Sequence, residues 1–234
     1  MKLTIVIPAH NEEDIIISTL RDLKKKLTVA CKVLVVDDHS TDKTSELVKK
    51  YIKKNNNVKL IGNYGSSRGF SSTLKIGFER ADTDYVLPVM ADLCDDPRTI
   101  NKMHSKISEG WDIVCGSRYM KGGSKEGGPK LQGLLSNFVC HSLKIATGIP
   151  TWDVSDAFKV YKKSLFKQFK IRDGAGVEIS MEITLKSFFI GARITEIPTH
   201  WKGRVIGDSK FKLLVRLPKY LKIYLWSLKK PFGF

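Results

Sequence analysis

The chain has 234 residues, enough for one α/β domain with at most a short appendage. Its hydrophobic content of 42% excludes global disorder, because that much apolar surface can form a substantial core. The formal net charge of +16 favours an anionic partner: nucleic acid, an anionic membrane surface or a phosphorylated substrate.

The four cysteines argue against a zinc site, because none forms a Cys-x-x-Cys pair and no histidine cluster accompanies them. They fit a reduced, cytosolic compartment. The apolar run that ends at Pro8 is too short for a signal peptide, and no segment reaches the ~18 apolar residues of a spanning helix. We therefore expect a cytoplasmic protein without a transmembrane span.

Strand-like and helix-like segments alternate along the first two-thirds of the chain. Helices are expected after Asn11, from Thr41 or Asp42, over Gly69–Arg80 and after Asp96. The expected strands are continuous apolar runs at Leu3–Ile7, Val33–Val36, Val58–Ile61, Tyr85–Met90 and Asp112–Gly116. This order predicts a mainly parallel sheet with helices on both faces.

Ligands of such sheets bind at the carboxyl ends of the strands. Asp37 and Asp38 end the second strand, where a carboxylate can accept hydrogen bonds from a base or a ribose. The alternative role, helix capping, is already available from Thr41 and Asp42. A dinucleotide-dependent oxidoreductase is disfavoured, because no Gly-x-Gly-x-x-Gly follows the first strand.

The last segment, residues 211–234, is basic and amphipathic, and we separate it from a main domain at 1–210. Pro218 is expected to divide it into two short helices. Such helices suit a peripheral contact with a lipid surface; packing on the sheet or against a partner helix are the alternatives. Nucleic acid is not expected as a partner, because aromatic residues are not interleaved with the basic clusters.

Two early motifs resemble the opening of family 2 glycosyltransferases with the GT-A (Rossmann-like) fold. They are Ile-Val-Ile-Pro-Ala-His-Asn-Glu-Glu, ending at Glu13, and Val-Val-Asp-Asp-His-Ser-Thr-Asp-Lys-Thr, ending at Thr44. The later segments Gly116–Tyr119, Asp153–Lys159 and Arg204–Lys210 are similar to the dolichyl-phosphate mannose synthase branch. Each motif alone is weak, but their joint order from about residue 3 to 210 is specific.

The resemblance implies a donor site for a GDP- or UDP-linked sugar. Arg68 stands where the family has a Lys-Gly pair near the nucleotide, so a role in neutralising the diphosphate is expected for it. The implied donor-binding residues are Pro8, His10, Glu12, Asp37, Asp38 and Arg68.

The metal-binding turn departs from the family pattern, because its Asp-x-Asp reads Met90-Ala91-Asp92 here. Mg²⁺ and Mn²⁺ prefer hard oxygen ligands and gain little from a thioether. Asp92 remains as the expected metal ligand, together with the donor diphosphate and water. Weakened metal dependence and loss of activity stay open as alternatives.

The implied acceptor site is basic. The branch has an arginine four residues before Ser136, where this chain has Gln132, with Lys130 nearby. Asp153 is expected to orient the acceptor, or to act as base if the acceptor is a hydroxyl, whereas Glu182 fits a structural ion pair equally well. The implied acceptor-binding residues are Arg118, Ser136, Arg204, Ser209 and Lys210, and the implied catalytic residues are Asp92, Asp153, Arg118 and Arg204.

The resemblance therefore predicts an inverting transfer of a hexose-type sugar from a nucleotide sugar to a polyprenyl phosphate at the membrane surface. Two alternatives remain open. One is transfer to a saccharide hydroxyl during glycan assembly, and the other is a protein that binds nucleotide sugar without transferring it.

Overall fold

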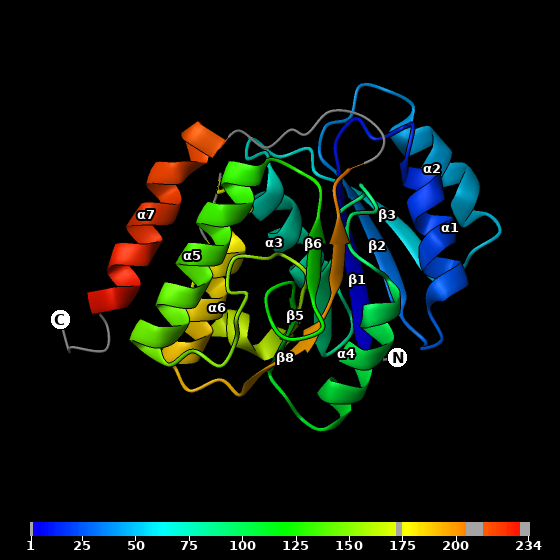
Figure 1. Cartoon of the computed structure of the whole chain (residues 1–234). Helices are drawn as coiled ribbons and strands as arrows, with labels where there is room; N and C mark the ends of the chain where they lie inside the picture. Colours follow the sequence, from blue (N-terminus) through cyan, green and yellow to red (C-terminus); the bar gives the residue numbers. More distant parts are fainter. Residues whose placement is uncertain (1, 172–174, 205–212, 230–234) are drawn as a thin grey trace.

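The computed structural model describes residues 2–171, 175–204 and 213–229 (Figure 1). Its strands are β1 (Leu3–Ala9), β2 (Lys32–Asp37), β3 (Val58–Gly62), β4 (Tyr85–Pro88), β5 (Ile113–Ser117), β6 (Ser124–Glu126), β7 (Lys159–Lys162), β8 (Ile194–Pro198) and β9 (His200–Lys202). Its helices are α1 (Ile16–Lys26), α2 (Thr44–Ile52), α3 (Phe70–Arg80), α4 (Arg98–Ser108), α5 (Lys130–Thr147), α6 (Ile179–Phe189) and α7 (Leu213–Lys229), with a short 3₁₀ turn at Lys163–Lys167.

Seven strands form the main sheet in the order β3-β2-β1-β4-β7-β5-β8. The strands β1 to β4 pair in parallel, as do β5 and β8. β7 alone in this sheet runs antiparallel to its neighbours β4 and β5. The expected mainly parallel sheet is thus confirmed, and the one reversed strand lies in the later third, where strand and helix patterns are less regular.

Helices cover both faces of the sheet, which explains why its central strands are apolar without alternation. Leu3, Ile5 and Ile7 of β1 pack in one cluster with α1, α2 and α4. Val6 of the same strand packs in a second cluster with α3 and α6. Successive side chains point to opposite faces, so a strand that is buried twice must be apolar at every position.

A third layer lies outside α6, where α5 and α7 pack side by side (Figure 1). Cys140, Leu143, Met181 and Ile223 form its buried cluster. Tyr224 of α7 also donates its hydroxyl to Ser142 Oγ of α5 at 3.2 Å. The C-terminal segment therefore packs on helices rather than on the sheet.

Two local predictions are wrong. α7 is one helix with Pro218 inside it, because the following turns pack against α5 and α6 while the proline removes a single backbone hydrogen bond. Asn11 does not cap α1, which begins at Ile16. Instead Asn11 Oδ1 accepts the backbone N–H of Thr41 at 2.8 Å, and this bond joins the loops after β1 and β2.

A second, two-stranded sheet of β6 and β9 lies beside the main one. Its register places Lys125 opposite Trp201, and an isolated bridge joins Trp201 to Asp95 in the loop after β4. This small sheet therefore holds the loop after β4 against the loops that follow β5 and β8.

Candidate active site

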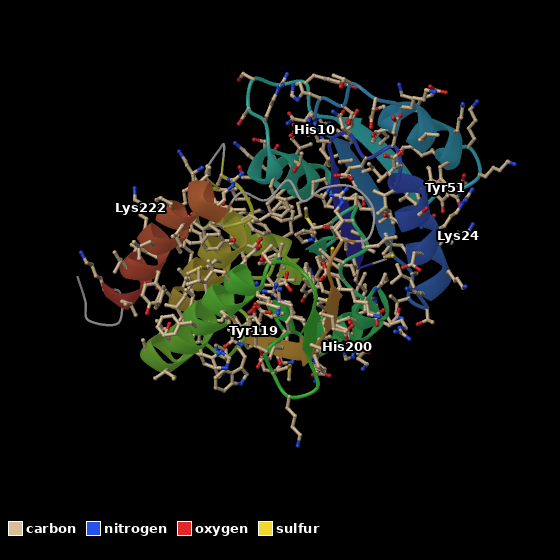
Figure 2. The ribbon with its side chains drawn as sticks, turned by 45° about the horizontal axis from the view of Figure 1, so that its top comes forward. His10, Lys24, Tyr51, Tyr119, His200 and Lys222 are labelled. Carbon is tan, nitrogen blue, oxygen red and sulfur yellow. The ribbon has the colours of Figure 1, made fainter. Side chains whose placement is uncertain are left out.

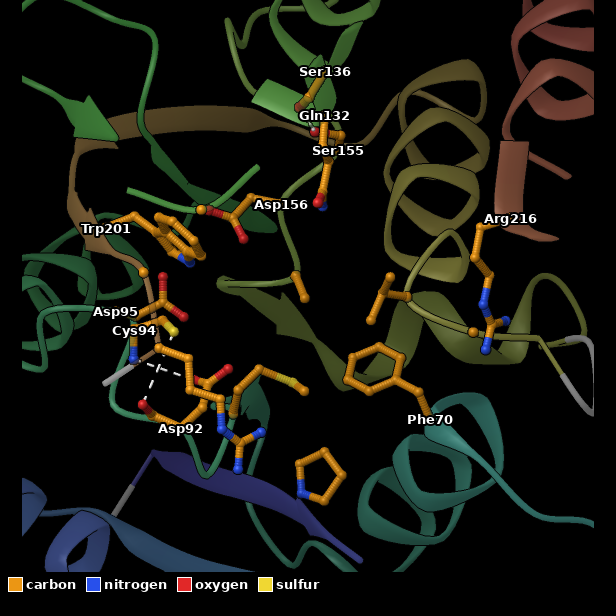
Figure 3. A pocket seen from close by; sticks show the side chains of 18 of the residues that line it. Phe70, Asp92, Cys94, Asp95, Gln132, Ser136, Ser155, Asp156, Trp201 and Arg216 are labelled. Carbon is orange, nitrogen blue, oxygen red and sulfur yellow. Dashed lines mark hydrogen bonds between the residues drawn. The ribbon is translucent and has the colours of Figure 1, made fainter. Parts of the chain in front are cut away.

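A cavity of about 760 Å³ opens at the carboxyl ends of β1, β2 and β4 and extends to α5 and α7 (Figure 3). Eight of the expected site residues line it: Pro8, His10, Glu12, Asp38, Asp92, Arg118, Ser136 and Arg204. Asp37, Arg68 and Asp153 are not among the lining residues. Ser209 and Lys210 lie outside the described residues.

Asp38 is held rigidly at the end of β2. Its Oδ2 accepts the backbone N–H of Gly69 at 2.7 Å, and its Oδ1 accepts the Asn63 amide at 2.7 Å. The His10 ring nitrogen Nδ1 lies 2.7 Å from the Asp38 backbone oxygen. Asp38 and His10 therefore form one preorganised wall, built from the loops after β1, β2 and β3.

Asp37 and Arg68 lie outside this wall. Asp37 is buried, where its Oδ1 accepts the Ser40 N–H at 3.1 Å and its Oδ2 accepts the Ser45 hydroxyl. It thus closes the turn between β2 and α2. Arg68 is exposed just before α3. The sequence pattern did not distinguish Asp37 from Asp38, because both follow the same buried strand.

Arg204 and Glu12 form an ion pair on the cavity wall, although 192 positions separate them in the sequence. Both side chains are largely buried, with exposed fractions of 17% and 10%. A buried guanidinium needs such a partner to offset the loss of hydration. The pair joins the loop after β9 to the loop after β1, and so encloses one side of the cavity.

Met90, Asp92 and Cys94 follow β4 and line the cavity together. Asp92 Oδ1 accepts the backbone N–H of Cys94 at 3.1 Å, which fixes the carboxylate within the turn (Figure 3). Within the described part of the chain, no group of three or more His, Cys, Asp or Glu side chains is arranged to hold a metal ion. Asp92 therefore offers one hard oxygen ligand group between two soft sulfur side chains.

Asp95 and Asp156 add two carboxylates that the sequence patterns did not assign as site residues. They line the cavity near Trp201 (Figure 3). Asp95 Oδ1 and Asp156 Oδ2 are enclosed and have no hydrogen-bond partner among the described residues. Burial raises the pKa of Asp95 well above its usual range, and the charges of Asp156 and Asp92 raise it further.

Arg118 forms the centre of a buried network. Its guanidinium donates two hydrogen bonds to Asp153, and its Nη2 also donates to Ser155 Oγ at 3.2 Å. Ser155 Oγ lies 2.9 Å from Ser136 Oγ, which also accepts the Tyr119 hydroxyl at 3.0 Å. The cavity residues Arg118 and Ser136 are thereby linked, with Asp153 behind them.

The far end of the cavity is apolar and lies between α3, α5, α6 and α7. Arg216 stands at its edge (Figure 3), where Nη1 is 3.3 Å from Oε2 of the fully buried Glu178. Lys219 Nζ lies 3.7 Å from the other oxygen of Glu178. The apolar side chains at this end are Phe70, Leu135, Val139, Val177, Leu217 and Tyr220.

Lys125 and Trp201 also line the cavity, and the sequence patterns did not nominate either. Lys130, the basic residue considered near Gln132, is exposed and is not among the lining residues. Proximity in sequence favoured Lys130. Lys125 lies within the glycine-rich stretch Gly122–Gly128. Glycines let the backbone turn sharply, so this stretch was the sequence feature that could have indicated a residue at the cavity.

The fold is that of GT-A glycosyltransferases, and solved structures support this assignment. S. aureus TarS 1–349 in complex with UDP-GlcNAc matches with a TM-score of 0.66 and 22% identity, covering 100% of this chain and 73% of that one. Glucosyl-3-phosphoglycerate synthase from Mycobacterium tuberculosis, in complex with Mn²⁺, UDP and glucosyl-3-phosphoglycerate, matches with a TM-score of 0.70 and 15% identity, covering 97% and 78%.

The family model described as "Glycosyl transferase family 2" matches residues 4–169, so the chain belongs to that family. The dolichol-phosphate mannosyltransferase of Pyrococcus furiosus is 31% identical over 221 residues, which cover 91% of this chain and 60% of the relative. The undecaprenyl-phosphate 4-deoxy-4-formamido-L-arabinose transferase of Salmonella paratyphi B is 26% identical over 226 residues, covering 91% and 63%. The chain thus spans less than two-thirds of these relatives, and the predicted branch of the family is supported.

Proposed function

We propose that this chain transfers a hexose-type sugar from a GDP- or UDP-linked donor to a polyprenyl phosphate at a membrane surface, with inversion at the anomeric carbon. The observation that carries the proposal is the composition of the single cavity described above. One end is polar and rigid around Asp38 and His10, and the other is apolar between α5 and α7. A nucleotide sugar suits the first end, and a lipid-linked acceptor suits the second.

Exposed apolar side chains on α5 and α7 support action at a membrane. Among the described residues, eight of the ten exposed large apolar side chains lie on these two helices. They are Leu131, Leu134, Phe138 and Ile145 on α5, and Val215, Leu217, Leu221 and Leu225 on α7. Neither helix contains an acidic residue, and Lys222 points outward from α7 (Figure 2). Apolar side chains flanked by cations match an anionic lipid surface.

Peripheral contact is the form of membrane association that we propose. Within the described ranges, no helix combines the length and the hydropathy needed to cross a bilayer. Replacing Leu134 and Phe138 by serine should weaken co-sedimentation with vesicles of phosphatidylcholine and phosphatidylglycerol. Tyr64→Ser, which removes an exposed aromatic residue far from α5 in the sequence, is the matched control. Equal sedimentation of both variants would contradict the membrane assignment.

We assign the metal role to Asp92, which would hold Mg²⁺ or Mn²⁺ together with the donor diphosphate. The cation would stabilise the charge that develops on the leaving nucleotide. Asp92 fits this role as a fixed carboxylate on the cavity wall, although the residues described around it supply no complete ligand set. A bound diphosphate would therefore have to provide several of the ligands. The two sulfur neighbours support weaker metal binding than an Asp-x-Asp turn would give.

Incubation of the purified chain with labelled nucleotide sugars and a short polyprenyl phosphate tests the proposal. We expect a labelled, lipid-linked product whose formation requires the phosphate and fails with the corresponding alcohol. Turnover with a saccharide hydroxyl, without a lipid-linked product, would reject the lipid acceptor. Binding of the nucleotide sugar without any turnover would reject transferase activity altogether.

A hydroxyl acceptor remains the second candidate because of Asp156. A hydroxyl needs a general base, whereas a phosphate is already anionic. Asp156 lines the cavity, and its buried Oδ2 accepts no hydrogen bond from the described residues, although it lies 3.3 Å from Arg118 Nε. Burial raises its pKa, although Arg118 opposes the shift. Asp156→Asn should abolish transfer to a hydroxyl acceptor but have a smaller effect on transfer to a phosphate.

A further inference from the structure

Lys125 occupies an unusual position for a surface cation. It is the middle residue of β6, opposite Trp201 of β9, and its ammonium lies 4.7 Å from the centre of the Trp201 ring. The ammonium also donates a hydrogen bond to the Gly127 backbone oxygen at 3.1 Å. These contacts hold the charged group at the cavity wall rather than letting it extend into solvent.

Two glycines make room for this ammonium. A Cβ atom at Gly133 would lie 3.2 Å from Lys125 Nζ, and one at Gly128 would lie 3.4 Å from it. Gly133 is in the first turn of α5, directly after Gln132. Lys125 therefore brings its charge to the first turn of α5, next to the position where Gln132 supplies no charge. The amino end of this helix adds positive potential at the same point.

Lys125 differs from the arginines that line the cavity, because each of those arginines pairs with a carboxylate. Arg118 pairs with Asp153 and Asp156, Arg204 pairs with Glu12, and Arg216 pairs with Glu178. Lys125 forms no ion pair with any carboxylate that the structure describes, although it lines the same cavity. Burial lowers its pKa, and the charge of Arg118 lowers it further. A bound anion would offset both effects and stabilise the charged form.

We propose that Lys125 binds the phosphate group of the acceptor and supplies the cation that Gln132 does not. The inference rests on the proposed function, because it assigns a residue to the acceptor of that reaction. The same chemistry could come from the donor diphosphate. The acceptor is favoured because the first turn of α5 leads into the apolar wall at Leu135 and Val139, where a lipid chain would lie.

The test compares Lys125→Gln with Lys130→Gln, which removes the same charge five residues away at an exposed site outside the cavity lining. Loss of a charge-assisted hydrogen bond should raise KM for a short polyprenyl phosphate about tenfold or more in K125Q. The donor KM should stay within about twofold, as should both constants in K130Q. Adding Gln132→Arg to K125Q should restore much of the acceptor affinity.

A rise in the donor KM instead would assign Lys125 to the donor diphosphate and overturn the proposal. Unchanged kinetics in K125Q would also overturn it. Binding can be measured through tryptophan fluorescence, because Trp201 lies next to the Lys125 ammonium. This measurement distinguishes failure of the proposed function from failure of the Lys125 assignment. If the wild-type chain binds the polyprenyl phosphate no better than the alcohol, the proposed function fails. If the wild type prefers the phosphate and K125Q keeps that preference, the Lys125 assignment alone fails.

Discussion

Arg118 and Asp153 form a two-point ion pair behind the cavity. Arg118 Nε donates to Asp153 Oδ2 at 2.7 Å, and Nη2 donates to Oδ1 at 2.9 Å. The Asp153 side chain is fully buried, and 10% of the Arg118 side chain is exposed. The backbone N–H of Arg118 donates to the same carboxylate at 3.0 Å. Asp153 contacts Arg118 directly but is not among the residues that line the cavity. We therefore interpret Asp153 as a residue that positions Arg118.

Asp153→Asn should destabilise the fold more than a surface substitution does. It removes the two-point partner of Arg118 and leaves Asp156, 3.3 Å from Arg118 Nε, as the remaining carboxylate of the pair. Breaking a buried ion pair costs ~3–5 kcal/mol, and the contact with Asp156 should keep the loss near the lower end of that range. Urea denaturation at neutral pH measures the loss. Asp112→Asn, which breaks the more exposed pair with Lys162, is the control and should cost less than ~1 kcal/mol. A folded, fully stable D153N enzyme that has lost all turnover would instead support direct catalysis.

The same ion pair predicts a dependence of stability on pH. Burial alone would raise the pKa of Asp153, but the charge of Arg118 and its hydrogen bonds outweigh burial and lower it. The unfolded chain therefore binds this proton more readily than the folded one. The stabilisation is present above the unfolded pKa of ~3.9 and is lost as the pH falls through the lowered folded value. Denaturation midpoints of wild type and D153N should converge in acid.

Asp95→Asn should have the opposite effect and stabilise the protein at neutral pH. Burial and the neighbouring charges of Asp156 and Asp92 raise the pKa of Asp95, so ionisation favours the unfolded chain. The gain should be absent below ~4, where the group is protonated in both states, and should grow as the pH rises. Thermal melting in a chelating buffer measures it. A melting temperature that is unchanged at every pH would contradict the assigned environment.

Met90→Asp should strengthen the dependence of donor binding on Mn²⁺. A second carboxylate beside Asp92 would replace a thioether, which is a poor ligand for a hard cation. The rise in melting temperature that a nucleoside diphosphate produces should become larger in the presence of Mn²⁺. Asp92→Asn should remove the Mn²⁺-dependent part in both backgrounds. A dependence that persists without Asp92 would place the metal elsewhere.

Asp38 and Arg68 should differ sharply in their importance for the donor. Asp38→Ala removes a cavity carboxylate, leaves the Gly69 N–H without its acceptor and takes away one of the two acceptors of the Asn63 amide, so the donor KM should rise about tenfold or more. Arg68→Gln alters an exposed side chain outside the lining residues and should change the donor KM less than about twofold. Initial rates at varied donor concentration give both values. A large effect in R68Q would restore its expected role at the diphosphate.

Much of the candidate site followed from strand order. Residues after β1, β2 and β4 were expected to meet because parallel strands bring their carboxyl ends to one edge of a sheet. His10, Asp38 and Asp92 do line one cavity. The pattern could not tell which of two adjacent carboxylates faces inward, because that depends on the loop conformation. The Asp37 carboxylate accepts a hydrogen bond within the β2–α2 loop, whereas the Asp38 carboxylate accepts one from Gly69 at the cavity.

The sequence by itself determined the α/β class, since continuous apolar runs can be satisfied only by strands that helices cover on both faces. It also determined the family, because the motifs occur in a specific order. Tertiary structure decided which charges act together. Arg118 forms an ion pair with Asp153, and Arg204 forms one with Glu12. Lys125, rather than Lys130, lines the cavity. Those pairings join segments far apart in the chain, so the balance between burial and charge that governs them exists only in the folded protein.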